Sequence, residues 1–252
     1  MANGFQQLGN GDHKVLVLHG WFGDHTTFDP MRAALSLDEF TYVLMDYRGV
    51  GKSKSLTGDY TNAEIATDAL ALMDRLGWER ASLVGHSMGG KAIQKIAAIA
   101  PQRVDKLVGI TPVPAAAVPF DDAGWALFEG AAGTPGNREA IIDFTTGNRN
   151  SKTWVQAMAA HSLETSTAEA FAAYLRAWAK EDFAADVQGM DKPMLVVVGE
   201  HDAAITAEAM QGTCLAWYPN ARLELVPNAG HYPMYETPVQ MATLMERFLR
   251  EA

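Results

Sequence analysis

The fold is decided by the stretch Leu83-Val84-Gly85-His86-Ser87-Met88-Gly89-Gly90, which joins an apolar run to a segment with helical spacing. The apolar run, Ala81–Val84, has the composition of a buried strand, and residues 88–100 have the spacing of a helix. Glycines on both sides of Ser87 allow the tight turn and the close helix packing that such a connection needs. The pattern therefore predicts a sharp strand-to-helix turn that holds the Ser87 hydroxyl above the edge of a sheet.

Short runs rich in Val, Leu and Ile recur on both sides of this turn, and each is followed by a longer segment with helical spacing. Such alternation is typical of a parallel sheet with helices on both faces. The candidate strands are Val15–Leu18, Tyr42–Met45, Ala81–Val84, Leu107–Ile110, Met194–Val198 and Leu223–Val226. The candidate helices are Phe28–Leu37, Thr61–Leu76, Met88–Ala100, Ala207–Trp217 and Val239–Leu249. We predict an α/β fold with a doubly wound, mostly parallel sheet.

The alternation stops after Ile110. From residue 112 to residue 188 the chain has no convincing strand; it starts with a Pro- and Ala-rich stretch and continues with helical spacing and many aromatic residues. We interpret this segment as a helical insertion, not as a repeat or a linker. The expected organisation is a core domain in two parts, residues 1–111 and 189–252, separated by a helical insertion at 112–188.

A serine hydroxyl is a poor nucleophile at neutral pH, so Ser87 would need a general base and an acid that orients the base. Asp202 follows one candidate strand and His231 follows the next. Because parallel strands end at one edge of a sheet, both side chains should lie near the turn at Ser87. We predict Ser87 as the nucleophile, His231 as the base and Asp202 as the acid.

Other residues compete for these roles. Glu200 lies two residues before Asp202 and is the rival acid. His19 and His86 lie in glycine-flanked turns and fit structural roles, with the imidazole bonded to backbone. His161, in the insertion, could touch a substrate, but a place at the surface or at the edge of the core is favoured. The remaining histidines have loop positions and no supporting pattern: His13, His25 and His201.

Acyl transfer also needs two hydrogen-bond donors for the oxyanion of the tetrahedral intermediate. The backbone amide of Met88 follows the nucleophile at the start of the helix. The backbone amide of Trp21 follows the first strong candidate strand, in Leu18-His19-Gly20-Trp21. We predict that these two amides form the oxyanion hole; the alternative for the second segment is an ordinary tight turn.

Five motif-like segments follow one another along the chain: Leu18-His19-Gly20-Trp21, Asp46-Tyr47-Arg48-Gly49-Val50-Gly51-Lys52-Ser53, Gly85-His86-Ser87-Met88-Gly89-Gly90, Gly199-Glu200-His201-Asp202 and Gly230-His231. With them, the chain resembles the α/β-hydrolase family across nearly its full length. The resemblance implies that Trp21 and Met88 form an oxyanion hole and that residues 112–188 are a lid over the pocket. It also implies that Asp46 and Arg48 secure loops.

Two features depart from that family's pattern. The usual first strands are reduced to a few residues around Phe5–Leu8, so the sheet should have seven strands, or fewer pairs at that edge. Lys91 places a charge in the helix after the nucleophile, where family members often carry an apolar residue. For this lysine we expect a solvated or ion-paired side chain.

The composition restricts the class of protein. A chain of 252 residues with 48% hydrophobic residues is long and apolar enough for a large core. A formal net charge of -10, without a basic cluster, argues against nucleic acid and anionic membranes as partners. The polar N-terminal segment, the short apolar runs and the single cysteine, Cys214, predict a soluble, cytoplasmic protein.

Neither a cofactor nor a metal is expected. Gly51-Lys52-Ser53 resembles the end of a phosphate-binding loop, but the glycine that the motif needs five residues earlier is Asp46 here. His161 with Glu164 is too little for a metal site. The partner that we expect is a small-molecule substrate.

These expectations combine into two-step acyl transfer, in which an acyl-enzyme forms on Ser87 and water releases it. We predict hydrolysis of carboxylic esters or lactones with small to medium apolar acyl groups. The side chains that would contact the substrate, if they do not simply pack the insertion onto the core, are Phe22, Trp125, Phe128 and Trp154. Alternatives are a carbon–carbon bond hydrolase or an enol-lactone hydrolase of aromatic catabolism. An alternative from another class is a non-catalytic ligand-binding relative.

Overall fold

A seven-stranded sheet forms the centre of the computed structural model, which describes residues 2–251. The strands are β1 (Phe5–Leu8), β2 (His13–Leu18), β3 (Phe40–Met45), β4 (Ala81–His86), β5 (Val104–Ile110), β6 (Met194–Gly199) and β7 (Ala221–Val226). Their order is β1-β3-β2-β4-β5-β6-β7, with β1 antiparallel to β3 and all other neighbouring pairs parallel. The predicted α/β fold with a doubly wound, mostly parallel sheet is confirmed.

Burial explains why the sequence revealed the inner strands. Every residue of β3, β4 and β6 is buried, because helices cover both faces of the sheet, and such strands are continuous apolar runs. All six candidate strands are present, and their bounds differ from the predicted ones by no more than three residues. The shortened first strand is β1, which brings the sheet to the expected seven strands.

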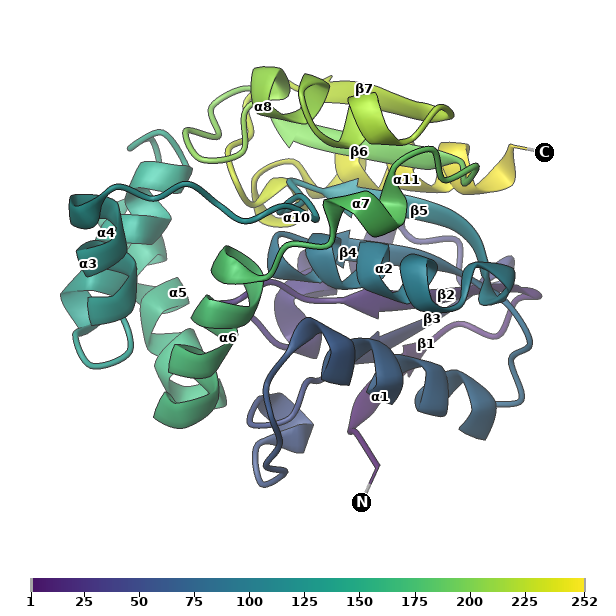
Figure 1. Ribbon diagram of the computed structural model, residues 1–252, viewed down its shortest axis with the longest axis horizontal. Helices are drawn as coiled ribbons and strands as arrows, with labels where there is room; N and C mark the ends of the chain where they lie inside the picture. The colour runs from purple at the N-terminus through teal and green to yellow at the C-terminus, as the bar shows by residue number, and fades with distance from the viewer. Residues whose placement is uncertain (1, 252) are drawn as a thin grey trace.

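Helices cover both faces of the sheet (Figure 1). They are η1 (His25–Ala34), η2 (Gly51–Ser53), α1 (Asn62–Arg75), α2 (Met88–Ile99), η3 (Pro101–Arg103), α7 (Ala184–Val187), α8 (Ala207–Gln211), α9 (Cys214–Trp217), α10 (Pro233–Glu236) and α11 (Pro238–Arg250). α1 and α2 pack side by side on one face, while η1 packs with α10 and α11 on the other. Within residues 2–251, no helix has both the length and the apolar character needed to cross a membrane.

Two predicted helices differ in the structure. The segment Phe28–Leu37 overlaps the 3-10 helix η1 and forms no α-helix; Pro30, which has no backbone N–H to donate, lies inside η1. The segment Ala207–Trp217 is two short helices, α8 and α9, because the first ends at the cap residue Gly212. Glycine is a poor helix former, so the break at this point follows from the local sequence.

Four helices between β5 and β6 form a helical insertion: α3 (Asp122–Gly130), α4 (Pro135–Thr145), α5 (Lys152–Thr165) and α6 (Ala168–Lys180). In Figure 1 they stand to one side of the sheet, coloured teal to green. The two connections between the insertion and the sheet run side by side, because Val118 N donates to Ala179 O at 2.8 Å and Phe183 N donates to Ala115 O at 2.9 Å. α7, which follows the outgoing connection, packs on α2.

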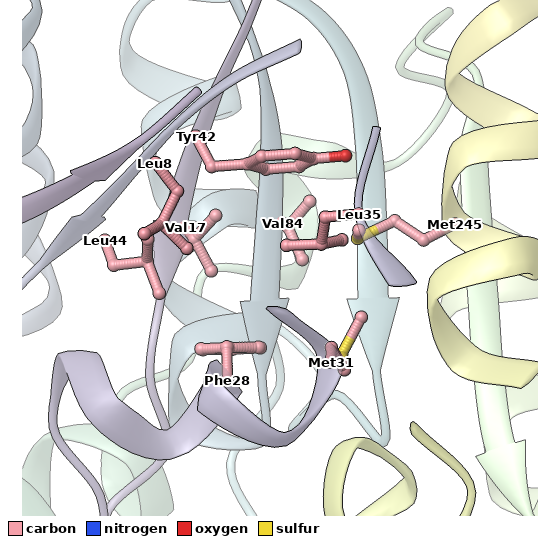
Figure 2. A pocket seen from close by; sticks show the side chains of 9 residues that line it. All are labelled: Leu8, Val17, Phe28, Met31, Leu35, Tyr42, Leu44, Val84 and Met245. Atoms are coloured by element: carbon pink, nitrogen blue, oxygen red, sulfur yellow. The ribbon is translucent and has the colours of Figure 1, made fainter. Parts of the chain in front are cut away.

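A small cavity lies between the sheet and the helices η1 and α11 (Figure 2). Its volume is about 10 Å³, room for one water molecule at most. Its lining side chains are Leu8, Val17, Phe28, Met31, Leu35, Tyr42, Leu44, Val84 and Met245. The one polar group among them, the Tyr42 hydroxyl, donates to Glu246 at 2.8 Å. This cavity is therefore a packing gap in the core and not a substrate site.

The start of α2 packs so closely on β2 that only glycine fits at position 89. A Cβ atom there would lie 2.3 Å from Leu18 O and 2.7 Å from His19 O, which are backbone atoms at the sheet edge. We expect Gly89→Ala to lower the free energy of unfolding by about 3 kcal/mol, measured by urea denaturation. Gly133→Ala is the control, because no atom lies within 4 Å of its added Cβ; it should change stability by less than about 0.5 kcal/mol. Equal stability of the two variants would contradict the tight packing.

Candidate active site

The turn between β4 and α2 holds Ser87 in an unusual backbone conformation. Its φ of 52° and ψ of -115° lie where residues other than glycine are strained. Four backbone hydrogen bonds maintain this geometry: Ser87 N donates to Ile110 O at 3.0 Å, and Ser87 O accepts from Gly90 N at 2.8 Å, Val113 N at 3.0 Å and Lys91 N at 3.3 Å. The predicted strand-turn-helix connection is confirmed, and it places the hydroxyl at the carboxyl edge of the sheet.

A continuous hydrogen-bonded chain joins the three residues predicted as the catalytic set. Ser87 Oγ lies 2.9 Å from His231 Nε2, and His231 Nδ1 lies 2.6 Å from Asp202 Oδ2. The other oxygen of Asp202 accepts from the backbone amides of Ala204 and Ile205, each at 2.9 Å. Asp202 and His231 are only 5% and 7% exposed. A carboxylate fixed in this way holds the proton on Nδ1, so that Nε2 can accept one from the serine.

The rival acid, Glu200, lies elsewhere. Its side chain is 50% exposed, and its carboxylate is 3.7 Å from His201 Nε2. Asp202, which has its oxygens aimed at His231 and at backbone amides, is therefore the acid that the geometry favours.

The backbone of His231 is held from two sides. Its carbonyl accepts from His86 Nε2 at 2.8 Å and from Thr111 Oγ1 at 3.1 Å, and its N–H donates to Thr145 O at 3.1 Å. Burial lowers the pKa of His86 well below its ordinary value, so this ring stays neutral and acts as a donor to the carbonyl. The structural role expected for His86 is confirmed. Thr111 and Thr145 carry no motif in the sequence, and sequence reasoning missed both.

The loop after β2 brings Trp21 beside the serine. A Cβ atom added to Gly20 would lie 2.5 Å from His86 Nδ1 and 3.2 Å from Ser87 Cβ, so the loop approaches as closely as glycine permits. Neither Trp21 N nor Met88 N bonds a backbone carbonyl within residues 2–251. Two backbone donors next to Ser87, the predicted nucleophile, thus have no backbone partner among the described residues and could serve an oxyanion.

His19 fixes the shape of this loop. Its Nδ1 donates to Gly20 O at 2.8 Å, and its own carbonyl accepts from Tyr47 OH at 2.8 Å. The His19 and Tyr47 rings pack with their centroids 4.0 Å apart. Burial lowers the pKa of His19, which keeps the ring neutral. The expected structural role of His19 is confirmed.

Aromatic side chains of the insertion pack on the same loop. This aromatic cluster consists of Trp21, Phe22, Phe120, Phe128, Phe171 and Trp178. Phe171 stacks on Trp21 with ring centroids 4.1 Å apart, and Trp21 Nε1 donates to Phe171 O at 2.8 Å. Of the residues predicted to contact a substrate, Phe22 and Phe128 belong to this cluster.

The other two predicted contact residues lie apart from Trp21. Trp125 packs against Phe120, 6.2 Å between ring centroids, and carries the ammonium of Lys180 over its ring at 4.3 Å. Trp154 packs edge-on against Tyr232 at 5.8 Å, on the His231 side of the site. The structure thus separates the four aromatic residues into two in the aromatic cluster, one beyond it and one beside His231.

The sequence of the chain matches that of a known protein family. Residues 14–238 match the sequence profile of the alpha/beta hydrolase fold, which is most of the chain. The chain belongs to the α/β hydrolase family. The resemblance noted in the sequence is therefore confirmed.

Named relatives of this α/β hydrolase span almost all of it. A putative esterase/lipase of Haemophilus influenzae is 27% identical over 245 residues, covering 94% of this chain and 83% of the relative. A 2-hydroxy-6-oxononadienedioate/2-hydroxy-6-oxononatrienedioate hydrolase of Burkholderia vietnamiensis is 27% identical over 265 residues, covering 98% and 90%. Among solved structures, a thermophilic esterase from Thermogutta terrifontis has a TM-score of 0.84 at 26% identity, covering 98% of this chain and 93% of its own.

The α/β hydrolase also contains a group of potential cation ligands, Asp24, His25 and Asp46. The Asp46 oxygens already accept from His25 N and Lys52 N, both at 2.7 Å, and Asp46 Oδ2 lies 2.7 Å from His25 Nδ1. These contacts join the loops after β2 and β3, as the resemblance implied for Asp46. Arg48 secures the next loop through two bonds to Asp68, at 2.7 and 2.8 Å. Because the carboxylates are occupied by N–H donors, the group fits a structural role.

Asp24 also links the hydrolase core to the insertion. Its Oδ1 lies 3.2 Å from Nε2 of His161, which stands on α5. Burial tends to raise the pKa of Asp24, but hydrogen bonds from His161 and Thr26 outweigh burial and hold this pKa well below its ordinary value. The hydrogen bond to Asp24 raises the pKa of His161 above 6.5. His161 therefore contacts a carboxylate at the edge of the core, the kind of position favoured from the sequence.

We expect Asp24→Asn to lower the pKa of His161, because the substitution removes the negative charge that stabilises the imidazolium. NMR titration of the His161 ring measures the change. Since the folded-state pKa of His161 is raised, protonation of this ring contributes stability that is fully present below about pH 6.5 and is lost as the pH rises through the raised value. Glu164→Gln is the control and should shift the pKa less, because Glu164 is the smaller influence. An unchanged His161 titration in Asp24→Asn would contradict the ion pair.

Proposed function

We propose that this α/β hydrolase is a serine hydrolase that cleaves carboxylic esters or lactones through an acyl-enzyme on Ser87. The observation that carries the proposal is the unbroken chain from Ser87 Oγ to His231 at 2.9 Å and on to Asp202 at 2.6 Å. A hydroxyl, an imidazole and a buried carboxylate in this order are the groups that convert serine into a nucleophile at neutral pH. The esterase names of two of its relatives agree with this chemistry.

In the proposed first step, Ser87 Oγ attacks the acyl carbon while His231 Nε2 takes the hydroxyl proton. The imidazolium that forms is stabilised by Asp202, and the N–H groups of Trp21 and Met88 hold the oxyanion. Each such donor lowers the barrier by about 3 kcal/mol. His231 then returns the proton to the leaving alkoxide, and a water molecule activated by the same imidazole releases the acid.

The proposal includes a lid role for the insertion, residues 112–188. Two contacts support it: α4 ends beside the base, where Thr145 O accepts from His231 N at 3.1 Å, and Phe171 stacks on Trp21. Aromatic surfaces close to the oxyanion donors suit a small or medium apolar acyl group. Phe22 and Phe128 are the proposed contacts for that group, because both belong to the aromatic cluster around Trp21.

A second candidate activity is carbon–carbon bond hydrolysis. The relative from Burkholderia vietnamiensis, whose alignment covers 98% of this chain, is named as a hydrolase of 2-hydroxy-6-oxononadienedioate and 2-hydroxy-6-oxononatrienedioate. An enol-lactone hydrolase would use the same three residues. Measured turnover of esters, lactones and β-diketones distinguishes these reactions, and negligible turnover of all three with tight ligand binding would indicate a receptor-like relative.

We also propose a cytoplasmic location, since the single cysteine, Cys214, is buried and unpaired.

We expect a fluorophosphonate probe to add once to the protein, at Ser87, as measured by intact mass and peptide mapping. Ser87→Ala should take up no probe and should hydrolyse p-nitrophenyl esters at the background rate, because Ser87 carries the one hydroxyl within residues 2–251 that hydrogen-bonds to His231 Nε2. The circular dichroism spectrum of the variant should match that of the parent. Ester hydrolysis at the parental rate in Ser87→Ala would refute the nucleophile.

We expect Asp202→Asn to reduce kcat by roughly 10⁴-fold, because an amide no longer holds the proton on Nδ1 of His231. Glu200→Gln is the matched control: it removes a carboxylate two residues away whose side chain is half exposed. Steady-state kinetics on one ester measures both variants. A large loss in Glu200→Gln together with an active Asp202→Asn would exchange the two assignments.

A further inference from the structure

Lys91 is a charged residue that the proposed reaction does not use. It lies on the first turn of α2, and its side chain has no exposed surface. Its N–H bonds Ser87 O at 3.3 Å, so the lysine and the serine share one helical turn. The expectation of a solvated or ion-paired side chain is wrong, because its hydrogen-bond partners are backbone carbonyls. A buried ammonium is costly unless its donors are paired, so these partners explain its presence.

The three carbonyls belong to the two connections of the insertion. Nζ of Lys91 donates to Ala116 O at 2.9 Å, on the incoming connection between β5 and α3. It also donates to Trp178 O at 2.9 Å and to Glu181 O, at the end of α6. An ammonium has three N–H groups, and all three are used. Carbonyls in the last turn of a helix lack partners within the helix and carry partial negative charge, which suits a cation.

We infer that Lys91 is a positioning residue whose ammonium fastens both connections of the insertion to the helix that starts at Ser87. Gln94 Nε2, also on α2, donates to Val113 O at 3.0 Å at the start of the incoming connection, whereas Lys91 Nζ bonds both connections. The inference rests on the proposed function in one respect, which is that the insertion covers the acyl site. Lys91 itself touches neither the substrate nor the reacting atoms.

A short chain of contacts leads from the ammonium to the oxyanion donors. Lys91 holds the backbone of Trp178, and the Trp178 ring packs edge-on against Trp21 with centroids 5.5 Å apart. The same ring packs edge-on against Phe128 at 5.7 Å. A shift of the outgoing connection therefore moves the aromatic cluster that lies beside the amide of Trp21. By this route the lysine sets the distance between the insertion and the nucleophile.

The surroundings of Lys91 keep it charged at neutral pH. Burial lowers its pKa to about 8, while Glu181 and Asp182 act in the opposite direction. The Phe183 ring faces Nζ at 5.7 Å, and Lys95 lies over the same ring at 4.6 Å and pairs with Asp186 at 3.6 Å. At pH 7 the amine is therefore mainly an ammonium with three donors.

Other contacts should keep the protein folded when the ammonium is removed. The connections remain joined by the bonds from Val118 N to Ala179 O and from Phe183 N to Ala115 O. The end of α6 also remains attached to α1, because Asn62 Nδ2 donates to Ala177 O at 2.9 Å. Lys91→Met, which keeps most of the side-chain volume, is therefore a suitable test variant.

The test compares Lys91→Met with the parent at pH 7, using p-nitrophenyl acetate and hexanoate. We expect KM for the hexanoate to rise about tenfold, since the longer acyl group needs the insertion in place, while kcat for the acetate falls by no more than about threefold. Hydrogen exchange at the amides of Val118 and Phe183 should be about tenfold faster, because opening of the connections becomes easier. Lys95→Met, one turn further along α2, is the control for loss of a lysine from this helix: it contacts the Phe183 ring and Asp186 but bonds no carbonyl of the connections, so it should leave KM for the hexanoate and exchange at the Val118 amide unchanged.

Unchanged KM for the hexanoate together with unchanged exchange at both amides would overturn the inference. Fluorophosphonate labelling of Ser87 in the same samples separates this result from failure of the proposed function, which would instead show as an unlabelled parent protein. Lys91→Gln is the second variant and is used if the methionine variant does not fold. The glutamine amide keeps two N–H donors, so KM for the hexanoate should rise less in this variant than loss of all three donors would cause. Parental KM and parental amide exchange in Lys91→Gln would again overturn the inference.

Discussion

The hydrogen bond from Ser87 N to Ile110 O extends the pairing of β4 with β5 by one residue beyond β4. Ser87 has a φ of 52°, and Thr111, the residue after β5, has a φ of 42°. Such conformations cost a residue other than glycine of order 1–3 kcal/mol, so they persist only where neighbouring bonds determine them. Thr111 N donates to Val197 O at 2.7 Å and Val113 N donates back to Ser87 O. The same strained edge thus holds Ser87, the proposed nucleophile, and turns the chain at once into the insertion.

His231, the proposed base, depends on this edge as well. The carbonyl of His231 is held by His86, which precedes the nucleophile, and by Thr111, while its N–H is held by Thr145 at the end of α4. The backbone of His231 is therefore held between the sheet and the insertion. A movement of α4 would change the position of the His231 backbone, and with it the 2.9 Å contact to Ser87 Oγ. For this reason the insertion is part of the support of the site in addition to any role as a cover.

The sequence could predict the features that depend on local pattern. The strands are continuous apolar runs, and strand ends in a parallel sheet meet at one edge, which was enough to select Ser87, Asp202 and His231. The α-helix expected at Phe28–Leu37 was wrong, because apolar residues at helical spacing do not distinguish an α-helix from the 3-10 helix η1 that forms there. Partners supplied by distant backbone could not be predicted, since a carbonyl such as Thr145 O carries no signal in the residue type. The aromatic residues of the insertion were visible, but their division between the aromatic cluster and other surfaces depends on how the helices pack.

The two proposed oxyanion donors are each followed, three residues later, by an attachment of the insertion. Asp24 follows Trp21 and binds His161 of α5, and Lys91 follows Met88 and binds both connections. The two attachments differ in strength. The His161 side chain is 34% exposed, and an exposed ion pair contributes about 0–1 kcal/mol and weakens with salt, whereas the Lys91 ammonium is shielded from solvent ions. In the proposed lid role of the insertion, the attachment at Asp24 should therefore separate before the attachment at Lys91.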